Sequence, residues 1–279
     1  MPLFTTRLLL FSLAVLAPAA APVIFTGGFE SGTLSPYRPE GEGDPASRSV
    51  AVVTSPHPVA EGRYSARFTL DLPSTTFPIM RNELLAWPYA KPNPGIGMLG
   101  QAYTYTFSHF VPTSWPNTAL PIEVAQFHVY PDFKSGENWR SPVLAFLIRN
   151  RQWDLVNRWD DNVVTTGATT RTINLGNPSL QLGTWTHWRV NVLWSWGDQT
   201  KPRGFLKIWK NGQLVVDRTG PNCYNDQFPR TFKWGLYTRA HWTGQSFPVA
   251  QYELFTDGFT VELSGSEAPA PPTRLRIIR

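Results

Sequence analysis

Stretches in which apolar and polar residues alternate recur along the chain, and most have the length of one β-strand. Gly, Pro, Asn and Asp, which favour turns, separate them. The stretches are 64–72, 101–111, 124–130, 143–150, 185–194, 204–209, 213–217, 232–239 and 251–263. Asn211 and Gly212 give the strongest hairpin signal, because this dipeptide suits a type I′ turn. Convincing helical periodicity is absent, so the pattern predicts an all-β protein built as a two-sheet β-sandwich.

The composition agrees with β structure. Aromatic residues make up 14% of the 279 residues, and 26 Pro and 21 Gly supply turns. Hydrophobic residues at 42% against charged residues at 16% provide a core and exclude a disordered chain. The single cysteine, Cys223, excludes an intrachain disulfide, a four-cysteine zinc site and an iron–sulfur cluster.

The two ends of the chain differ from the rest. Arg7 precedes the short apolar run 8–16, and Ala17, Pro18 and Ala19 form a small-x-small cleavage site. We therefore predict a signal peptide at 1–19, a single domain at 20–263, and a disordered, Pro-rich tail at 264–279. The apolar run is too short to span a bilayer and no later segment is long enough, so no membrane association is expected. These features predict a secreted or periplasmic protein.

The net charge of +5 favours an anionic partner for an exported protein. No Lys- and Arg-rich run or zinc-finger spacing supports nucleic acid as that partner. An acidic polysaccharide fits the compartment better, although a basic surface can also be merely solvated. The chain is expected to be a monomer.

Three predicted strands carry chemically active side chains two positions apart, which places them on one face. The residues that share a face are Arg81 with Glu83, Gln126 with His128, and Lys233 with Tyr237 and Arg239. Gly235, between Lys233 and Tyr237, is expected to leave a gap where a ligand could approach the backbone. Each set alone also has an explanation without a function. Arg81 and Glu83 fit an ordinary surface ion pair, and His128 fits a half-buried histidine. Lys233 and Tyr237 fit a solvent-exposed strand face. Together they supply a cation, an amide, an imidazole and a phenol.

These strands resemble the signature strands of jelly-roll polysaccharide lyases, in which Arg-x-Glu-Leu, Gln-x-His and Phe-Lys-x-Gly-x-Tyr motifs line a concave groove. Motifs typical of the heparinase I and glucuronan lyase branch are GFESG at 28–32, GTWTHW at 183–188, GFLKIWKNG at 204–212 and GPN at 220–222. The resemblance covers residues 25–263 and implies a concanavalin-like β-jelly roll with a concave substrate groove. The compact chain resembles glucuronan lyase more than the larger heparinase I.

Such a lyase cleaves a 4-linked uronic acid by β-elimination and leaves an unsaturated uronate end. The carboxylate beside C5 must be neutralised, a base must remove the C5 proton, and an acid must protonate the leaving O4. The resemblance implies that Gln126, helped by Arg81, neutralises the carboxylate and that His128 and Tyr237 transfer protons. Lys233 would hold the acidic chain or lower the pKa of Tyr237. The substrate-binding residues implied are Arg81, Glu83, Lys233 and Arg239.

The stereochemistry of the sugar decides how His128 and Tyr237 share the work. In glucuronate or mannuronate the C5 proton and O4 lie on one ring face, so a single tyrosine could act as base and then acid. In guluronate or iduronate they lie on opposite faces, and His128 would be the base and Tyr237 the acid. The sequence leaves the polyuronate (glucuronan-like, alginate-like or heparin-like) and endo or exo action open.

Other residues compete for the same roles. The rival phenols and imidazoles are Tyr105, Tyr130, Tyr224, His57, His109, His187 and His241. The tryptophans that lie outside the clearest core strands could stack on sugar rings, and they are Trp139, Trp153, Trp159 and Trp242.

No cofactor is expected for catalysis, and a structural calcium ion is one possible ligand. Glu30 near the first strand and Asp257 near the last are expected to lie together, and hard carboxylate oxygens suit Ca²⁺. The alternative is two unrelated surface carboxylates.

Two other classes of function stay open. A glycoside hydrolase needs two carboxylates flanking the scissile bond. The acidic groups Glu40, Glu42 and Asp44, and Asp160 with Asp161, are expected in loops, and no predicted strand presents two acids on one face. A non-catalytic carbohydrate-binding module would keep the tryptophans without needing Gln126, His128 and Tyr237 together.

Overall fold

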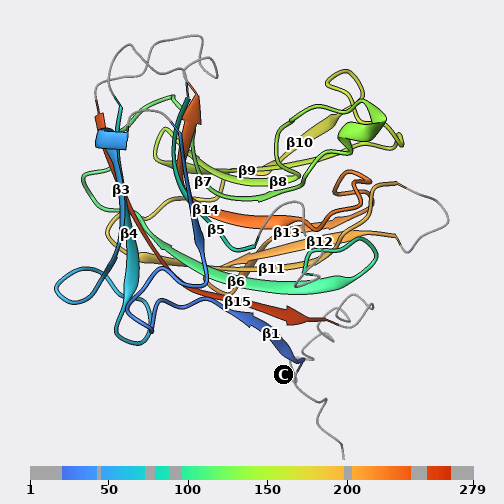
Figure 1. Ribbon diagram of the computed structural model, residues 1–279. Helices are drawn as coiled ribbons and strands as arrows, with labels where there is room; N and C mark the ends of the chain where they lie inside the picture. Colours follow the sequence, from blue (N-terminus) through green and yellow to red (C-terminus); the bar gives the residue numbers. More distant parts are fainter. Residues whose placement is uncertain are drawn as a thin grey trace, which may run out of the picture.

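The computed structural model describes residues 21–42, 45–72, 79–87, 96–197, 203–239 and 250–264. Two antiparallel β-sheets packed face to face form nearly all of the regular structure there (Figure 1). The helical segments of these ranges are the two short 3-10 turns Pro45–Ser47 and Phe133–Ser135. No helix in the described part of the chain could cross a membrane. The predicted all-β sandwich is confirmed.

Some sequence predictions concern residues that these ranges leave out. The predicted signal peptide at 1–19, all but the first residue of the predicted tail, and the candidates His241 and Trp242 lie outside the described residues. They stay predictions.

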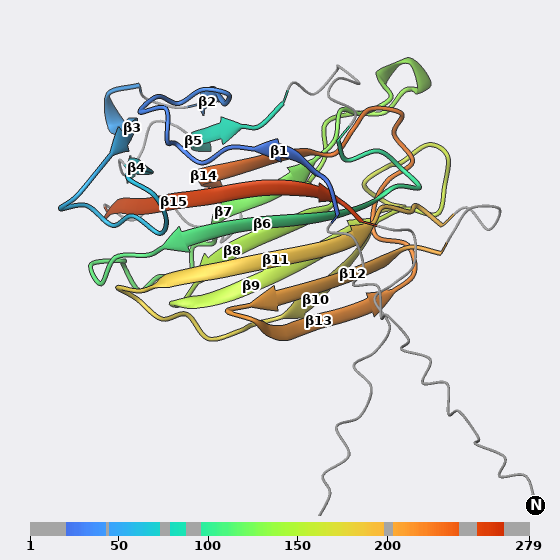
Figure 2. The ribbon, with the colours of Figure 1, turned by 90° about the horizontal axis from the view of Figure 1, so that it is seen from below.

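The first sheet contains eight strands of the described chain, in the order β13-β12-β11-β6-β15-β4-β3, with β1 paired to β15 (Figure 2). Its strands are β1 (Val23–Thr26), β3 (Arg48–Val53), β4 (Ser65–Leu72), β6 (Ala102–Phe110), β11 (Trp185–Leu193), β12 (Phe205–Lys210), β13 (Gln213–Thr219) and β15 (Ala250–Leu263). The Asn211–Gly212 turn joins β12 to β13, as the hairpin signal predicts.

The second sheet contains seven strands of the described chain, in the order β10-β9-β8-β7-β14-β5-β2. Its strands are β2 (Arg38–Glu42), β5 (Ile79–Leu85), β7 (Ile122–His128), β8 (Leu144–Arg149), β9 (Gln152–Trp159), β10 (Arg171–Gly176) and β14 (Thr231–Arg239). The three strands with chemically active residues, β5, β14 and β7, are therefore adjacent in one sheet.

Aromatic side chains from both sheets fill the space between them. The ring of Phe232 on β14 stacks on Phe259 of β15 with 4.3 Å between centroids, and Trp153 of β9 packs on Trp188 of β11 at 5.0 Å. Burial of such rings is the main stabilising contribution in a sandwich core. Because Phe232 points inward, alternation turns its neighbour Lys233 toward the opposite face of the second sheet.

Gly235 is required by a close approach of two strands. Its φ of 138° is in the region that favours glycine, and a Cβ there would lie 2.3 Å from the carbonyl oxygen of Asn82 and 2.7 Å from Cα of Glu83. The expected gap for a ligand at Gly235 is therefore wrong. The missing side chain makes room for β5.

Candidate active site

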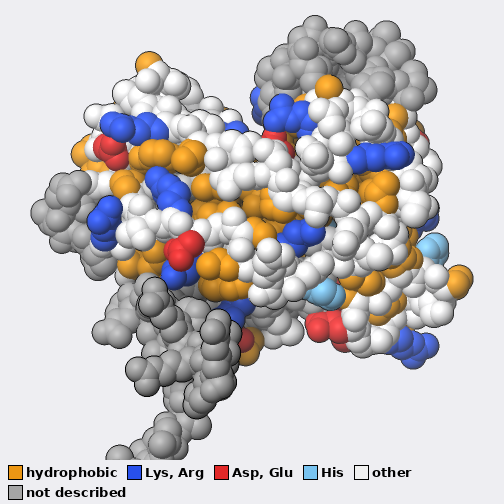
Figure 3. All heavy atoms as spheres, turned by 180° about the vertical axis from the view of Figure 1, so that it is seen from behind, with side chains coloured by type: hydrophobic (Ala, Val, Ile, Leu, Met, Phe, Trp, Pro, Cys, Tyr) orange, Lys and Arg blue, Asp and Glu red, His pale blue; other side chains and the backbone are white. Residues whose placement is uncertain are grey.

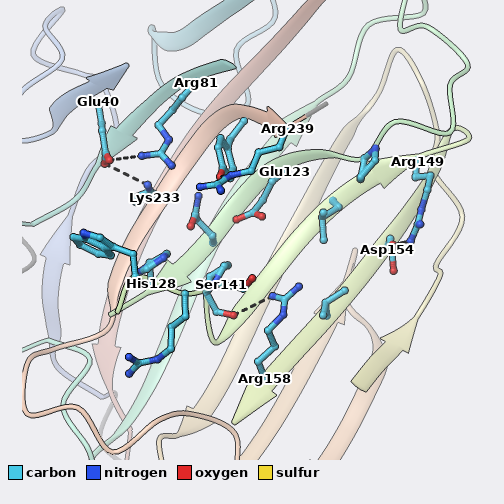
Figure 4. Close-up of a pocket in the computed structure, with 18 of the residues that line it drawn as sticks. Glu40, Arg81, Glu123, His128, Ser141, Arg149, Asp154, Arg158, Lys233 and Arg239 are labelled. Atoms are coloured by element: carbon cyan, nitrogen blue, oxygen red, sulfur yellow. Dashed lines mark hydrogen bonds and ion pairs between the residues drawn. The ribbon is translucent and has the colours of Figure 1, made fainter. Parts of the chain in front are cut away.

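A groove of about 850 Å³ runs along the face of the second sheet that points away from the first (Figure 4). Strands β2, β5, β7, β8, β9 and β14 and the segment 139–142 provide its walls and floor. Its charged and titratable lining residues are Glu40, Arg81, Glu123, His128, Tyr130, Arg140, Arg149, Asp154, Arg158, Lys233, Tyr237 and Arg239. Basic residues outnumber acidic ones in this set, as they do over the face shown in Figure 3.

Strand register explains why the candidates from three separate segments meet. Lys233 of β14 lies opposite Gln126 of β7, and Tyr237 lies opposite Arg81 of β5. His128 lies opposite Thr231, so His128 and Tyr237 are on opposite sides of the Gln126–Lys233 pair along the strands. The groove thus brings together Arg81, Gln126, His128, Lys233, Tyr237 and Arg239.

Glu83 lies beneath these residues and holds three of them. Its Oε2 is 2.9 Å from Nζ of Lys233 and 3.2 Å from Nε of Arg81, and its Oε1 accepts a 2.6 Å hydrogen bond from Nε2 of Gln126. The side chains of Glu83 and Lys233 are each only 1% exposed. Glu83 therefore occupies the floor of the site, where it orients the donors. A direct contact of Glu83 with substrate stays a prediction.

Glu40 of β2 completes this ion-pair network. Its Oε1 accepts a 2.6 Å hydrogen bond from Nη1 of Arg81, and its Oε2 is 3.3 Å from Nζ of Lys233 (Figure 4). The loop expected around Glu40 is wrong, because residues 38–42 form β2 and pair with β5. The segment reads Arg-Pro-Glu-Gly-Glu, so it carries no apolar alternation that could have revealed a strand.

Tyr237 lies between two guanidinium groups. Cζ of Arg81 is 4.4 Å from the centroid of its ring, Cζ of Arg239 is 5.5 Å away, and Nε of Arg239 donates a hydrogen bond to its hydroxyl oxygen. Burial raises the pKa of Tyr237 above its usual value, and the neighbouring Arg81 opposes that rise. The phenol is therefore protonated at neutral pH and can donate a proton.

His128 is a neutral imidazole on the other side of Gln126. Burial and then the positive charge of Lys233 lower the pKa of His128 to about 3. Its Nδ1 lies 2.9 Å from the carbonyl oxygen of Val129, and the backbone of Arg140 is a second hydrogen-bonding neighbour. In the tautomer with the ring proton on Nδ1, that nitrogen donates to the Val129 carbonyl and Nε2 is the basic nitrogen.

Several groove residues were not predicted from the sequence, and Arg158 and Glu123 show two different reasons. Arg158 lies on β9, where every second residue, Asp154, Val156 and Arg158, lines the groove. This alternation along β9 is visible in the sequence and predicts that Arg158 faces the groove. Glu123 lies on β7 just before the predicted strand begins. The pairing of β7 with β8 shifts between Glu123 and Ala125, so strict alternation from Gln126 would place Val124 in the groove instead of Glu123.

An aromatic cluster marks one end of the groove. Trp139 is 56% exposed, and its ring lies 5.7 Å from that of His128 and 5.5 Å from that of Tyr130. Trp139 is thus placed where a sugar could stack. Trp153 is fully buried between the sheets, so this candidate is a core residue and does not stack on sugar.

The remaining rivals lie away from the groove floor. Tyr105 and His109 are fully buried in the core, and the hydroxyl of Tyr224 donates to the carbonyl oxygen of Ser141. His187 pairs with Ser108 on the first sheet. His57 packs against Phe255 of β15.

Glu30 and Asp257 bind the same loop. Asp257 Oδ2 accepts backbone hydrogen bonds from Ala60 at 2.9 Å and Glu61 at 3.1 Å, and the Glu30 carboxylate accepts from residues 63 and 64 at 2.9 and 3.1 Å. Backbone N–H groups thus already donate two hydrogen bonds to Asp257 Oδ2 and one to each carboxylate oxygen of Glu30. Within the described residues, neither belongs to a cluster of three side chains suited to a metal. Calcium binding by this pair stays a prediction.

A different acidic cluster already has a cation. Asp132, Glu137 and Asp226 have carboxylate oxygens within 4.8 Å of one another. Arg140 donates from Nη1 to Glu137 at 2.9 Å and from Nη2 to Asp226. The guanidinium offsets part of the negative charge of this cluster and links the segment 139–142 to Glu137 and Asp226.

Comparison with known proteins gives the class of the chain that carries this groove. A family model described as polysaccharide lyase matches residues 29–258, which is most of the chain. The chain belongs to the polysaccharide lyase family, and the predicted enzyme class is confirmed. Among curated protein sequences, none matches this chain significantly.

Solved structures share the architecture at low sequence identity. An endo-β-1,4-glucuronan lyase from the fungus Trichoderma reesei superimposes with a TM-score of 0.70 at 17% identity, covering 87% of this chain and 96% of the other. The catalytic domain of a glycoside hydrolase family 131 protein from Coprinopsis cinerea has a TM-score of 0.51 at 16% identity, covering 88% and 95%. These likenesses show the fold.

Proposed function

We propose that this protein cleaves a 4-linked polyuronate by β-elimination. The observation that carries the proposal is the groove itself, in which an amide, two kinds of cation, a neutral imidazole and a protonated phenol converge on one sheet. An excess of Lys and Arg in the lining suits a polyanionic chain.

Each step of the reaction has a residue suited to it. Arg81 and Gln126, both held by Glu83, bind the carboxylate beside C5 and stabilise the negative charge that develops there. The base takes the C5 proton, the C–H electron pair forms the C4–C5 double bond, and the C4–O4 bond breaks. Tyr237 gives its proton to O4, since the phenol is protonated in the free protein.

The base depends on the sugar. Where the C5 proton and O4 lie on opposite faces, His128 and Tyr237 approach from the two sides of Gln126, as their register supports. Where both lie on one face, Tyr237 first loses its proton to solvent, and the adjacent Arg81 and Arg239 stabilise the phenolate, which then takes the C5 proton and passes it to O4. Tyr237 is the acid in both cases.

We propose glucuronan as the first substrate to test. The support is the shared architecture with the Trichoderma reesei glucuronan lyase, which extends over 87% of this chain. The proposal includes action outside the cytoplasm, supported by the leader-like sequence at 1–19.

The experiment is a product assay of the purified protein on glucuronan, alginate, heparan sulfate and hyaluronan. A lyase produces ultraviolet-absorbing unsaturated uronate ends on at least one of these polymers. New reducing ends without that absorbance would show a hydrolase, and binding without cleavage would show a carbohydrate-binding module. The ion pairs of Glu40 and Glu83 argue against a hydrolase, because both carboxylates are already occupied by cations.

A further inference from the structure

Glu123 lines the groove but has no role in the proposed β-elimination. It lies on β7 opposite Tyr237 of β14, and the register between these strands shifts between Trp234 and Tyr237. A second shift, in the pairing with β8, falls between Glu123 and Ala125. Together the two shifts aim the carboxyl group into the groove while leaving the residue only 2% exposed.

The carboxyl group of Glu123 has no partner in the described part of the chain. Its Oε1 is buried without a hydrogen bond, and no ion pair is formed by either oxygen within those residues. Every other groove carboxylate described here, namely Glu40, Glu83 and Asp154, has a cationic partner. Burying an unpaired carboxylate costs far more free energy than burying the neutral carboxylic acid.

The charged groups around Glu123 do not reverse this preference for the neutral carboxylic acid. They come from every neighbouring strand and are Arg81 and Glu83 of β5, Lys233, Tyr237 and Arg239 of β14, Arg149 of β8, and Asp154 and Arg158 of β9. Burial and then the charge of Glu83 raise the pKa of Glu123 to about 8, against the opposing effects of Arg158, Lys233 and Arg81. Those cations are engaged elsewhere: Arg81 and Lys233 with Glu83, and Arg158 with the Pro142 carbonyl at 3.1 Å.

A neutral carboxylic acid in a groove for a polyanion has a clear use. It donates one O–H, and a hydrogen bond from O–H to a carboxylate is among the strongest in proteins. The ionised form could only accept, and it would repel a second carboxylate nearby. We propose that Glu123 is a specificity residue that remains protonated and donates a hydrogen bond to a carboxylate of the bound polyuronate. This proposal rests on the proposed function for the identity of the ligand.

The protonation state can be measured without any substrate. Nuclear magnetic resonance of the protein with ¹³C-labelled glutamate side chains would be recorded against pH for the wild type and Glu123→Gln, and the signal missing from the variant is Glu123. We expect that signal to titrate near pH 8. Titration below pH 6 would overturn the proposal, whatever reaction the enzyme catalyses.

The consequence for binding is measured with an oligoglucuronate in the Tyr237→Phe background, which prevents cleavage. If only the protonated acid binds, affinity is retained below pH 8 and falls above it, so the Kd rises about tenfold between pH 7 and pH 9 for a pKa of about 8. Adding Glu123→Gln keeps a neutral donor, and the ratio of the two Kd values should fall to about one.

The matched control is Glu262→Gln, which alters a glutamate of β15 on the first sheet and should leave the tenfold ratio in place. An unchanged pH dependence in Glu123→Gln would overturn the role in recognition. If oligoglucuronate fails to bind at either pH, the same pair of measurements is made with the polymer cleaved in the product assay. If the assay finds no such polymer, the proposed function fails, and with it the role in recognition, while the titration still decides the protonation state.

Discussion

Nζ of Lys233 lies 2.9 Å from Oε2 of Glu83, and both side chains are 99% removed from solvent. A buried ion pair is maintained only when its remaining hydrogen-bonding capacity is satisfied, because taking two charges out of water is costly. Glu83 meets this condition through Arg81 and Gln126, and Lys233 meets it through Glu40. The pair therefore fixes the positions of the donors that face the substrate.

Glu83→Gln should destabilise the protein by about 3 kcal/mol, because it removes the negative charge that lies 2.9 Å from Nζ of buried Lys233. Chemical denaturation would measure the free energy of unfolding. The matched control is Glu253→Gln, which breaks the half-exposed pair with Arg67 and should cost less than about 1 kcal/mol. Equal losses in the two variants would contradict the importance of the buried network.

Tyr237→Phe should lower kcat by about 10²- to 10⁴-fold, because it removes the proton donor and keeps the ring against Arg81. Oligosaccharide affinity and thermal stability should change little. Tyr64→Phe is the control, since Tyr64 also lies beside an arginine, Arg63, but outside the groove. Retention of most activity by Tyr237→Phe would show that another group is the acid, and Tyr130 would be tested next.

His128→Ala should separate the two stereochemical routes. We expect near-complete loss of activity on guluronate or iduronate polymers and partial activity on glucuronate or mannuronate polymers. Because the pKa of His128 is lowered to about 3, its imidazole remains a base as the pH falls from 7 to 5. The kcat/KM of the wild type on a guluronate polymer should therefore show no ionisation of His128 in that interval. A loss of kcat/KM with a midpoint near pH 6.5 on that polymer would contradict this assignment.

Substrate binding should weaken steeply from low to moderate ionic strength, because the groove carries an excess of positive charge. Arg158→Ala should raise KM and reduce this salt dependence. Arg189→Ala is the control, because Arg189 lies over Trp209 on the first sheet, away from the groove. A KM that does not respond to salt would mean that the basic lining does not bind the substrate.

The sequence predicts most of this site because β14 obeys strict alternation. Phe232, Trp234 and Leu236 enter the core, and Lys233 and Tyr237 therefore reach the opposite face. No comparable regularity exists at Glu123, where a register shift moves the side chain to the groove face. A bulge arises from the pairing with the partner strand, so the local pattern of apolar and polar residues does not reveal it.

Strands whose stability comes from their partners are also hard to predict. The segment Arg38–Glu42 has little apolar character and becomes β2 because β5 provides an edge to pair with. Glu40 was for that reason expected in a loop. In β9, by contrast, buried Trp153, Leu155 and Asn157 alternate with the groove residues Asp154 and Arg158, a pattern that sequence analysis could have used.

The most direct test of the account is the ratio of unsaturated uronate ends to new reducing ends when the purified protein digests glucuronan. β-Elimination creates one double bond for every chain cleavage, so ultraviolet absorbance and reducing-end analysis should give equal numbers of ends. Tyr237→Phe should lower both by the same factor. Reducing ends that accumulate without ultraviolet absorbance would mean that the groove hydrolyses the glycosidic bond, and the proposed elimination would be wrong.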